Sequence, residues 1–160
     1  MTSPKPTGRV AGNDLILTRT FRAPIVDVWK SVTDSDSCAR WFGPWEGDAG
    51  PGKMIRLQMV HEKGQPWMEM TIEACEPPRH LAVTSKGDHG VSLDVTFEQK
   101  GETTTMTFVH HMADKKMAPD YGPGWEYYLD NLVAARAEAP LVKFEDYDPS
   151  QREHFLAQIR

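Results

Sequence analysis

The chain has 160 residues, of which 39% are hydrophobic and 26% charged, and its length fits one domain that buries a core without metal or disulfide staples. A net charge of -5 argues against a nucleic-acid partner, which would need a basic surface, and the apolar stretches are too short to span a membrane. No charged segment leads into an apolar one at the start, so we expect a cytoplasmic protein.

The N-terminal quarter predicts a lead-in, a strand and two short helices. Residues 1–13 are rich in proline and glycine and poor in apolar side chains, which predicts a flexible lead-in, and a strand should follow over residues 14–22. Pro24 suits the first turn of a helix, because its missing N–H would have no partner there. The apolar residues beyond it share one helical face: Ile25, Val28, Trp29 and Val32.

The next segment changes from helix to sheet. Asp34 or Ser35 can cap a second short helix that ends near Phe42, before Gly43-Pro44. Polar and apolar residues then alternate in segments separated by glycine and proline turns, which is typical of antiparallel strands. The predicted strands cover residues 53–61, 67–75, 80–86, 91–99 and 103–112.

Alternation in the last strand singles out one histidine. Met106 and Phe108 alternate with Thr105 and Thr107, so the same spacing places His110 on the apolar face. A histidine on an otherwise apolar face is the first candidate for a ligand contact. His111 must face the other way, so the two histidines cannot bind one metal ion together.

A long helix is predicted over residues 124–139, ended by Pro140. One apolar stripe facing one apolar sheet surface predicts that the sheet curls round this helix. The stripe consists of Trp125, Tyr128, Leu129, Leu132 and Val133.

Residues 140–160 predict a C-terminal extension with a short helix. Asp148 reads as its N-cap and Pro149 as its first residue, and an apolar face follows at Phe155, Leu156 and Ile159. A helix this short must dock to be stable. We expect it to dock on its own domain, with a second copy of the chain in a homodimer as the alternative.

The search for catalytic and metal motifs is negative. The sequence has no glycine-rich phosphate loop, no zinc-protease motif and no nucleophile elbow. Cys38 and Cys75 lack metal-type spacing and read as reduced, packed thiols. We therefore predict neither a metal site nor a tightly bound cofactor.

Five segments in order resemble the START-like (SRPBCC) superfamily, and within it the branch named after activators of a heat-shock chaperone's ATPase. They are the run over residues 18–44 with Trp41-Phe42-Gly43-Pro44, the turn Pro51-Gly52, the strand ending before Pro77-Pro78, the threonine-rich strand over residues 103–110, and Gly124-Trp125. The resemblance extends from about Asp14 to Ala139. It implies an α+β helix-grip fold, with a curved antiparallel sheet around a long C-terminal helix, two short helices after the first strand, and a cavity between sheet and helix.

The resemblance also proposes residues around that cavity. Composition turns Ile55 and Leu57 inward, whereas the family pattern after Gly52 would turn Arg56 and Gln58 inward; both registers stay open. Trp41, Trp45 and Tyr121 are candidates for a lid, although Trp41 can also pack the small helices onto the sheet. The other candidate ligand contacts are Met68, Met70, Phe108, His110, Trp125 and Tyr128.

Three functions remain. The first is a module that binds a small hydrophobic or amphipathic molecule, and the second is an enzyme of the cyclase or hydrolase kind that uses the same cavity. The third is a module that acts on a chaperone, which is disfavoured because the eukaryotic activators carry an additional N-terminal domain that residues 1–13 could not replace. Glu69 and Glu73 lie opposite Met68, so we expect them in solvent and favour binding over catalysis.

Overall fold

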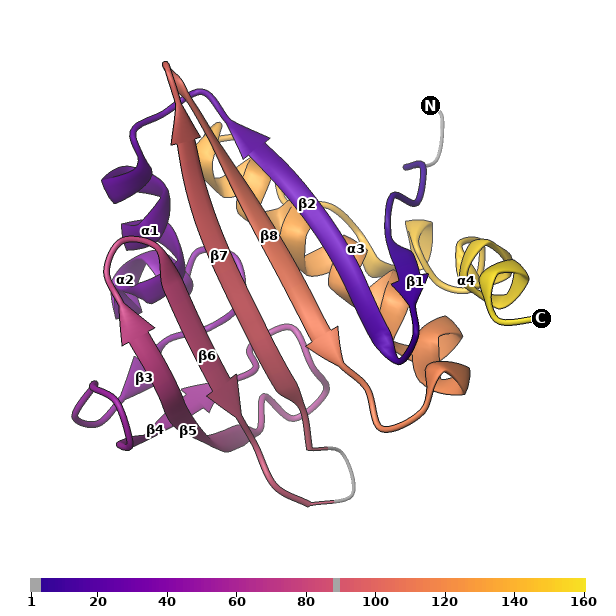
Figure 1. The fold of residues 1–160 in the computed structure, drawn as a ribbon, viewed down its shortest axis with the longest axis horizontal. Helices are drawn as coiled ribbons and strands as arrows, with labels where there is room; N and C mark the ends of the chain where they lie inside the picture. The colour runs from indigo at the N-terminus through magenta and orange to yellow at the C-terminus, as the bar shows by residue number, and fades with distance from the viewer. Residues whose placement is uncertain (1–3, 88–89) are drawn as a thin grey trace.

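The computed structural model describes residues 4–87 and 90–160. Its strands form one antiparallel eight-stranded sheet in the order β1-β2-β8-β7-β6-β5-β4-β3 (Figure 1). The strands are β1 (Arg9–Ala11), β2 (Asp14–Phe21), β3 (Trp45–Glu46), β4 (Met54–Gln58), β5 (Trp67–Glu76), β6 (His80–Thr84), β7 (Ser92–Lys100) and β8 (Thr103–His111).

The helices lie around this sheet. The long helix α3 (Ala118–Arg136) lies behind β8 and β2 in Figure 1, and α4 (Arg152–Gln158) lies beside β1. The short helices α1 (Ile25–Thr33) and α2 (Ser35–Cys38) follow β2 and lie on the opposite side of the view from α4. Short 3-10 helices cover Lys115–Met117 and Phe144–Asp146. The predicted α+β helix-grip architecture is therefore confirmed.

The core lies between the sheet and α3. Alternation along β2, β7 and β8 places every second side chain on the concave face, where the apolar stripe of α3 covers it. Val133, which helical spacing placed in that stripe, is instead 38% exposed. Its most deeply buried apolar residues include Leu15, Leu17, Met106, Leu129 and Leu132. Within the described residues no helix combines the length and the apolar character needed to cross a bilayer.

The flexible lead-in predicted for residues 1–13 is wrong over residues 4–13; residues 1–3 lie outside the described residues. β1 pairs with β2, with Val10 opposite Leu15. Upstream of β1, the backbone N–H groups of Thr7 and Gly8 donate to the buried Glu126 on α3. Backbone hydrogen bonds need no apolar side chains, so composition could not reveal this ordering.

Two helices begin elsewhere than predicted. α3 starts at Ala118 rather than Gly124, because Asp114 caps the 3-10 turn that runs directly into it, and Pro123 lies inside the helix. α4 starts at Arg152 after Gln151, so the predicted cap at Asp148 is wrong. The predicted cap of α2 is confirmed: the Asp34 carboxylate accepts from the Ser37 N–H at 3.0 Å.

The C-terminal extension packs on its own chain. The Phe155 side chain is 0% exposed, and a Cβ added at Gly122 of α3 would lie 2.5 Å from its ring. A Cβ added at Gly8 would lie 2.8 Å from the same ring. The ring is therefore held between two backbone segments that approach closely because both carry glycine there. Tyr147 adds a hydrogen bond of 2.7 Å from its hydroxyl to Asp130 of α3.

Candidate functional site

His110 lies on the concave face of β8, as predicted. Its side chain is buried, with 2% of the residue exposed, and its Nδ1 accepts a hydrogen bond of 3.0 Å from Trp125 Nε1 on α3. The ring of Tyr121, one turn earlier on α3, meets the His110 ring edge-on at 4.6 Å between centroids. A polar group therefore sits at the contact between sheet and helix.

The protonation of His110 follows from this position. Burial, and to a smaller extent the charge of the neighbouring His111, lowers the pKa of His110 to about 4. The ring is therefore neutral near pH 7. Because Nδ1 acts as an acceptor, the proton of the neutral ring resides on Nε2, which is the group that can donate.

Further aromatic pairs on α3 and β8 extend from the rings that contact His110. Phe108 packs on Trp125 with centroids 4.6 Å apart, and Phe42 packs on Tyr128 at 4.4 Å. The Tyr128 hydroxyl donates to Glu62 at 2.9 Å, which joins α3 to the loop between β4 and β5. Burial and the Glu62 charge both raise the pKa of Tyr128, so its hydroxyl keeps its proton.

The β4–β6 part of the concave face is apolar and only partly covered. Ile55 and Leu57 of β4 pack against the core, as do Met68 and Val83, and all four are half-buried. Met70 of β5 is buried beside them. The register predicted by composition is the one observed.

Arg56 and Gln58 consequently face away from the core, and the family register that would bring them to a ligand is wrong. Arg56 is exposed, pairs with Glu46 at 2.7 Å, and lies over the Trp67 ring at 5.0 Å from its centroid. The Gln58 amide donates to the Gln65 carbonyl at 3.3 Å. Adjacent residues of a strand point to opposite faces, so an inward Leu57 requires an outward Arg56.

Trp41 and Trp45 hold the small helices in place. The Trp41 indole donates to the Ser31 carbonyl and the Trp45 indole to the Thr33 carbonyl, both at 2.9 Å. These bonds support the packing interpretation of Trp41 that the sequence left open. Trp41 also reaches the core cluster, whereas Trp45 belongs to the short edge strand β3, which alternation had not predicted.

A buried ionic network on α3 was missed. Glu126 is 1% exposed and pairs with Arg19 of β2 at 2.9 Å, and Arg19 also reaches Asp130 at 3.0 Å. Neither carboxylate belongs to the predicted apolar stripe of this helix, so helical spacing did not indicate that Glu126 is buried. An arginine in the inward row of a strand was the available signal, since a buried cation requires a partner.

A second cluster lies on the outer face of the sheet. Asp94 accepts from His80 at 2.6 Å and from His111 at 2.7 Å, and Asp14 accepts from His111 at 2.7 Å. The bonds to Asp14 and Asp94 raise the pKa of His111. Among the described residues no group of three or more histidine, cysteine or acidic side chains is arranged to hold a metal ion.

Two further expectations concern charge and thiols. Glu69 and Glu73 are exposed on the outer face, as predicted. Cys38 and Cys75 are both free, and burial raises the pKa of the Cys38 thiol to about 12. A thiol with so high a pKa is a packing group rather than a nucleophile.

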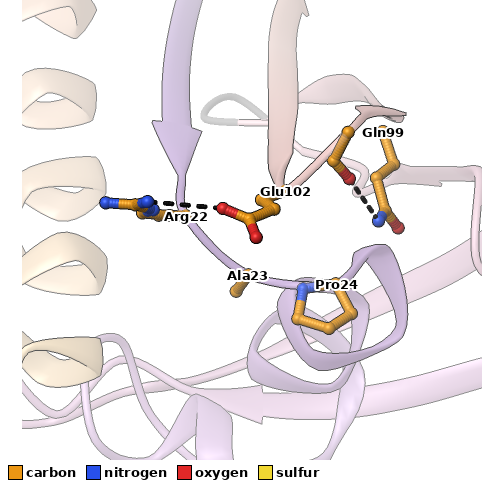
Figure 2. Close-up of a pocket in the computed structure, with 6 residues that line it drawn as sticks. Arg22, Ala23, Pro24, Gln99 and Glu102 are labelled. Carbon is orange, nitrogen blue, oxygen red and sulfur yellow. Dashed lines mark hydrogen bonds and ion pairs between the residues drawn. The ribbon is translucent and has the colours of Figure 1, made fainter.

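A pocket of about 400 Å³ lies outside the space between sheet and α3 (Figure 2). It is formed where the turn between β2 and α1 meets the β7–β8 hairpin, and Arg22 pairs with Glu102 across it at 3.3 Å. Both charged side chains are more than four-fifths exposed, at 84% and 82%. Its rim is therefore solvated and offers little apolar surface.

A model of the family described as "Activator of Hsp90 ATPase homolog 1-like protein" matches residues 22–137. The fold is also that of CalU16 from Micromonospora echinospora, with 23% identity, a TM-score of 0.76, and coverage of 92% of this chain and 88% of that one. The protein encoded by gene BPP1335 from Bordetella parapertussis gives 24% identity, a TM-score of 0.77, and coverage of 98% and 94%. DynU16, assigned to the dynemicin biosynthetic locus, gives 18% identity, a TM-score of 0.70, and coverage of 84% of this chain and 51% of that one. A comparison with curated proteins finds no match.

Proposed function

Because this chain belongs to the family of activator of Hsp90 ATPase homolog 1-like proteins, within the SRPBCC superfamily, we propose that it binds a small hydrophobic or amphipathic molecule between its sheet and α3. The observation that carries the proposal is the half-buried apolar wall of β4–β6, which belongs to the same concave sheet face as the buried ring of His110. Small-molecule sites in proteins combine an apolar lining with a few oriented polar groups. The assignment of DynU16 to a biosynthetic locus is consistent with a small-molecule ligand.

His110 orients the ligand in this proposal. Its neutral ring donates from Nε2 to an acceptor on the ligand, while Trp125 holds Nδ1 and fixes the ring. Tyr121, Phe108 and Tyr128 supply aromatic surface around that contact. Met68 and Met70 supply adaptable apolar surface on β5, which suits ligands of more than one shape.

Binding is better supported than catalysis. An acid–base site needs titratable groups that converge on one substrate atom. In the described part of the chain, the side-chain partner of His110 is an indole, and Glu69 and Glu73 are on the outer face. The chaperone-directed function has less support still, because the exposed large apolar residues are single side chains on separate elements, such as Val26 on α1, Val133 on α3 and Leu156 on α4.

Fluorescent probes test the proposal. An anionic naphthalene-sulfonate dye and the neutral dye Nile red should each bind the folded protein with one-to-one stoichiometry at micromolar concentration. His110→Leu should weaken the anionic dye more than the neutral one, because the substitution removes a hydrogen-bond donor. Arg79→Leu is the matched control, since Arg79 is exposed in the turn between β5 and β6, and should leave both affinities unchanged. A folded wild-type protein that binds neither dye would refute the proposal.

A further inference from the structure

A slot opens in the sheet where β5 and β6 separate. Their pairing ends at Thr71 opposite Thr84, where β6 stops, whereas β5 extends back to Trp67. Residues 67–70 of β5 are therefore paired with β4 alone. A pocket of about 410 Å³ occupies this place, and its lining includes Met59, Trp67, Met68, Glu69, Thr84 and Lys86.

The slot is lined by residues from both rows of β5. Met68 belongs to the inward row of β5 and packs against the core cluster. Trp67 and Glu69 belong to the outward row, and Trp67 stacks with the exposed Arg56. The pocket therefore borders the flank of β5 that β6 leaves unpaired, where residues of both rows meet.

The side of the interior next to α3 is closed by contacts. Tyr128 is bonded to Glu62 at 2.9 Å and packs against Phe42, so the β4–β5 loop is tied to α3. Deeper inside, Trp125 is bonded to His110. A ligand that entered beside α3 would meet both hydrogen bonds, whereas the slot is lined in part by methionine side chains, which are unbranched and flexible.

We propose that the slot between β5 and β6 is the entrance through which a ligand reaches the concave face. This inference rests on the proposed function. Met59 and Met68 supply flexible apolar lining, and Glu69 and Lys86 supply charged groups. This arrangement suits an elongated amphipathic molecule that enters with its apolar end first while its polar end stays at the rim.

Binding kinetics test the entrance. Thr84→Trp places a large side chain at the rim and should slow both association and dissociation of Nile red by about fivefold or more in stopped-flow fluorescence, with Kd unchanged within about twofold. Thr96→Trp is the matched control: the same substitution on the outer face of β7, where Thr96 is exposed and away from the slot, should change neither rate. Trp67→Ala removes a rim side chain and should speed both rates.

The outcomes separate the two proposals. If the wild-type protein binds no dye, both the proposed function and the entrance are refuted. If the dye binds but neither Thr84→Trp nor Trp67→Ala changes its rates, the entrance alone is refuted. If either variant changes Kd through the dissociation rate alone, the entrance is also refuted, because the slot would then be part of the binding site. Should Thr84→Trp fail to fold, as judged by circular dichroism, Trp67→Ala decides the question.

Discussion

The docking of the C-terminal extension on α3 can be tested with a double-mutant cycle. The Phe155 ring is completely buried, so Phe155→Ala should destabilise the domain by about 3–5 kcal/mol, the range for large-to-small aromatic changes in cores. Gly122→Ala adds a methyl group 2.5 Å from that ring. The ring cannot move aside, because the Gly8 backbone lies on it as well, and overpacking of this kind costs about 1–3 kcal/mol.

The two substitutions should be strongly coupled. In a Phe155→Ala background the space beside Gly122 is empty, so Gly122→Ala should cost less there, by about 1–3 kcal/mol. The backbone preference of alanine before Pro123 is the same in both backgrounds and cancels in the cycle. Urea unfolding followed by circular dichroism gives each free energy of unfolding.

Gly124→Ala is the matched control for this cycle. Gly124 lies in the same helix, but a Cβ added there meets no atom within 4 Å, so its cost should not depend on Phe155. An equal cost of Gly122→Ala in both backgrounds would refute the docking of Phe155 on α3.

Two further predictions concern buried polar groups. Glu126→Ala should destabilise by about 3–5 kcal/mol, because it leaves Arg19 buried without its principal partner, whereas Glu138→Ala on the surface should stay within about 0.5 kcal/mol in urea unfolding. Burial lowers the pKa of His110 to about 4 in the folded protein, below the value of about 6.5 expected in the unfolded chain. As the pH falls below about 6.5, the unfolded chain therefore binds this proton before the folded protein does. The contribution of His110 to stability is complete above that pH and is lost toward pH 4. His110→Gln, whose amide can still accept from Trp125, should therefore reduce the loss of stability between about pH 7 and pH 4.5, and an undiminished loss would contradict this.

Sequence periodicity predicted the features that depend on one-sided burial. Met106, Phe108 and His110 had to share a face, because a slip of one residue would expose all of them. The same reasoning placed Leu129 and Leu132 in the core. In β4 the alternation of apolar residues was a better guide than the family register, because burying Arg56 would have required a buried partner, whereas on the outer face it pairs with Glu46 in solvent.

Features that depend on partners distant in sequence could not be predicted. Glu126 is buried because Arg19 and the N–H groups of Thr7 and Gly8 surround its carboxylate, and Arg19 lies 107 positions away. Periodicity within α3 contains no information about these partners. The slot likewise depends on where β6 stops relative to β5, which turn residues alone do not determine.

The two ends of the chain meet over α3, and this bears on the order of folding. The His154 ring and the Gly8 carbonyl are 2.7 Å apart, and these residues are separated by 146 positions. Contacts between such distant segments carry a loop-closure entropy, so we expect them to form late, after the sheet and α3 have assembled. Interactions that are absent from the folding transition state chiefly control the unfolding rate. We therefore expect the contacts between the segment around Gly8 and the C-terminal extension to control the unfolding rate of the domain rather than its folding rate.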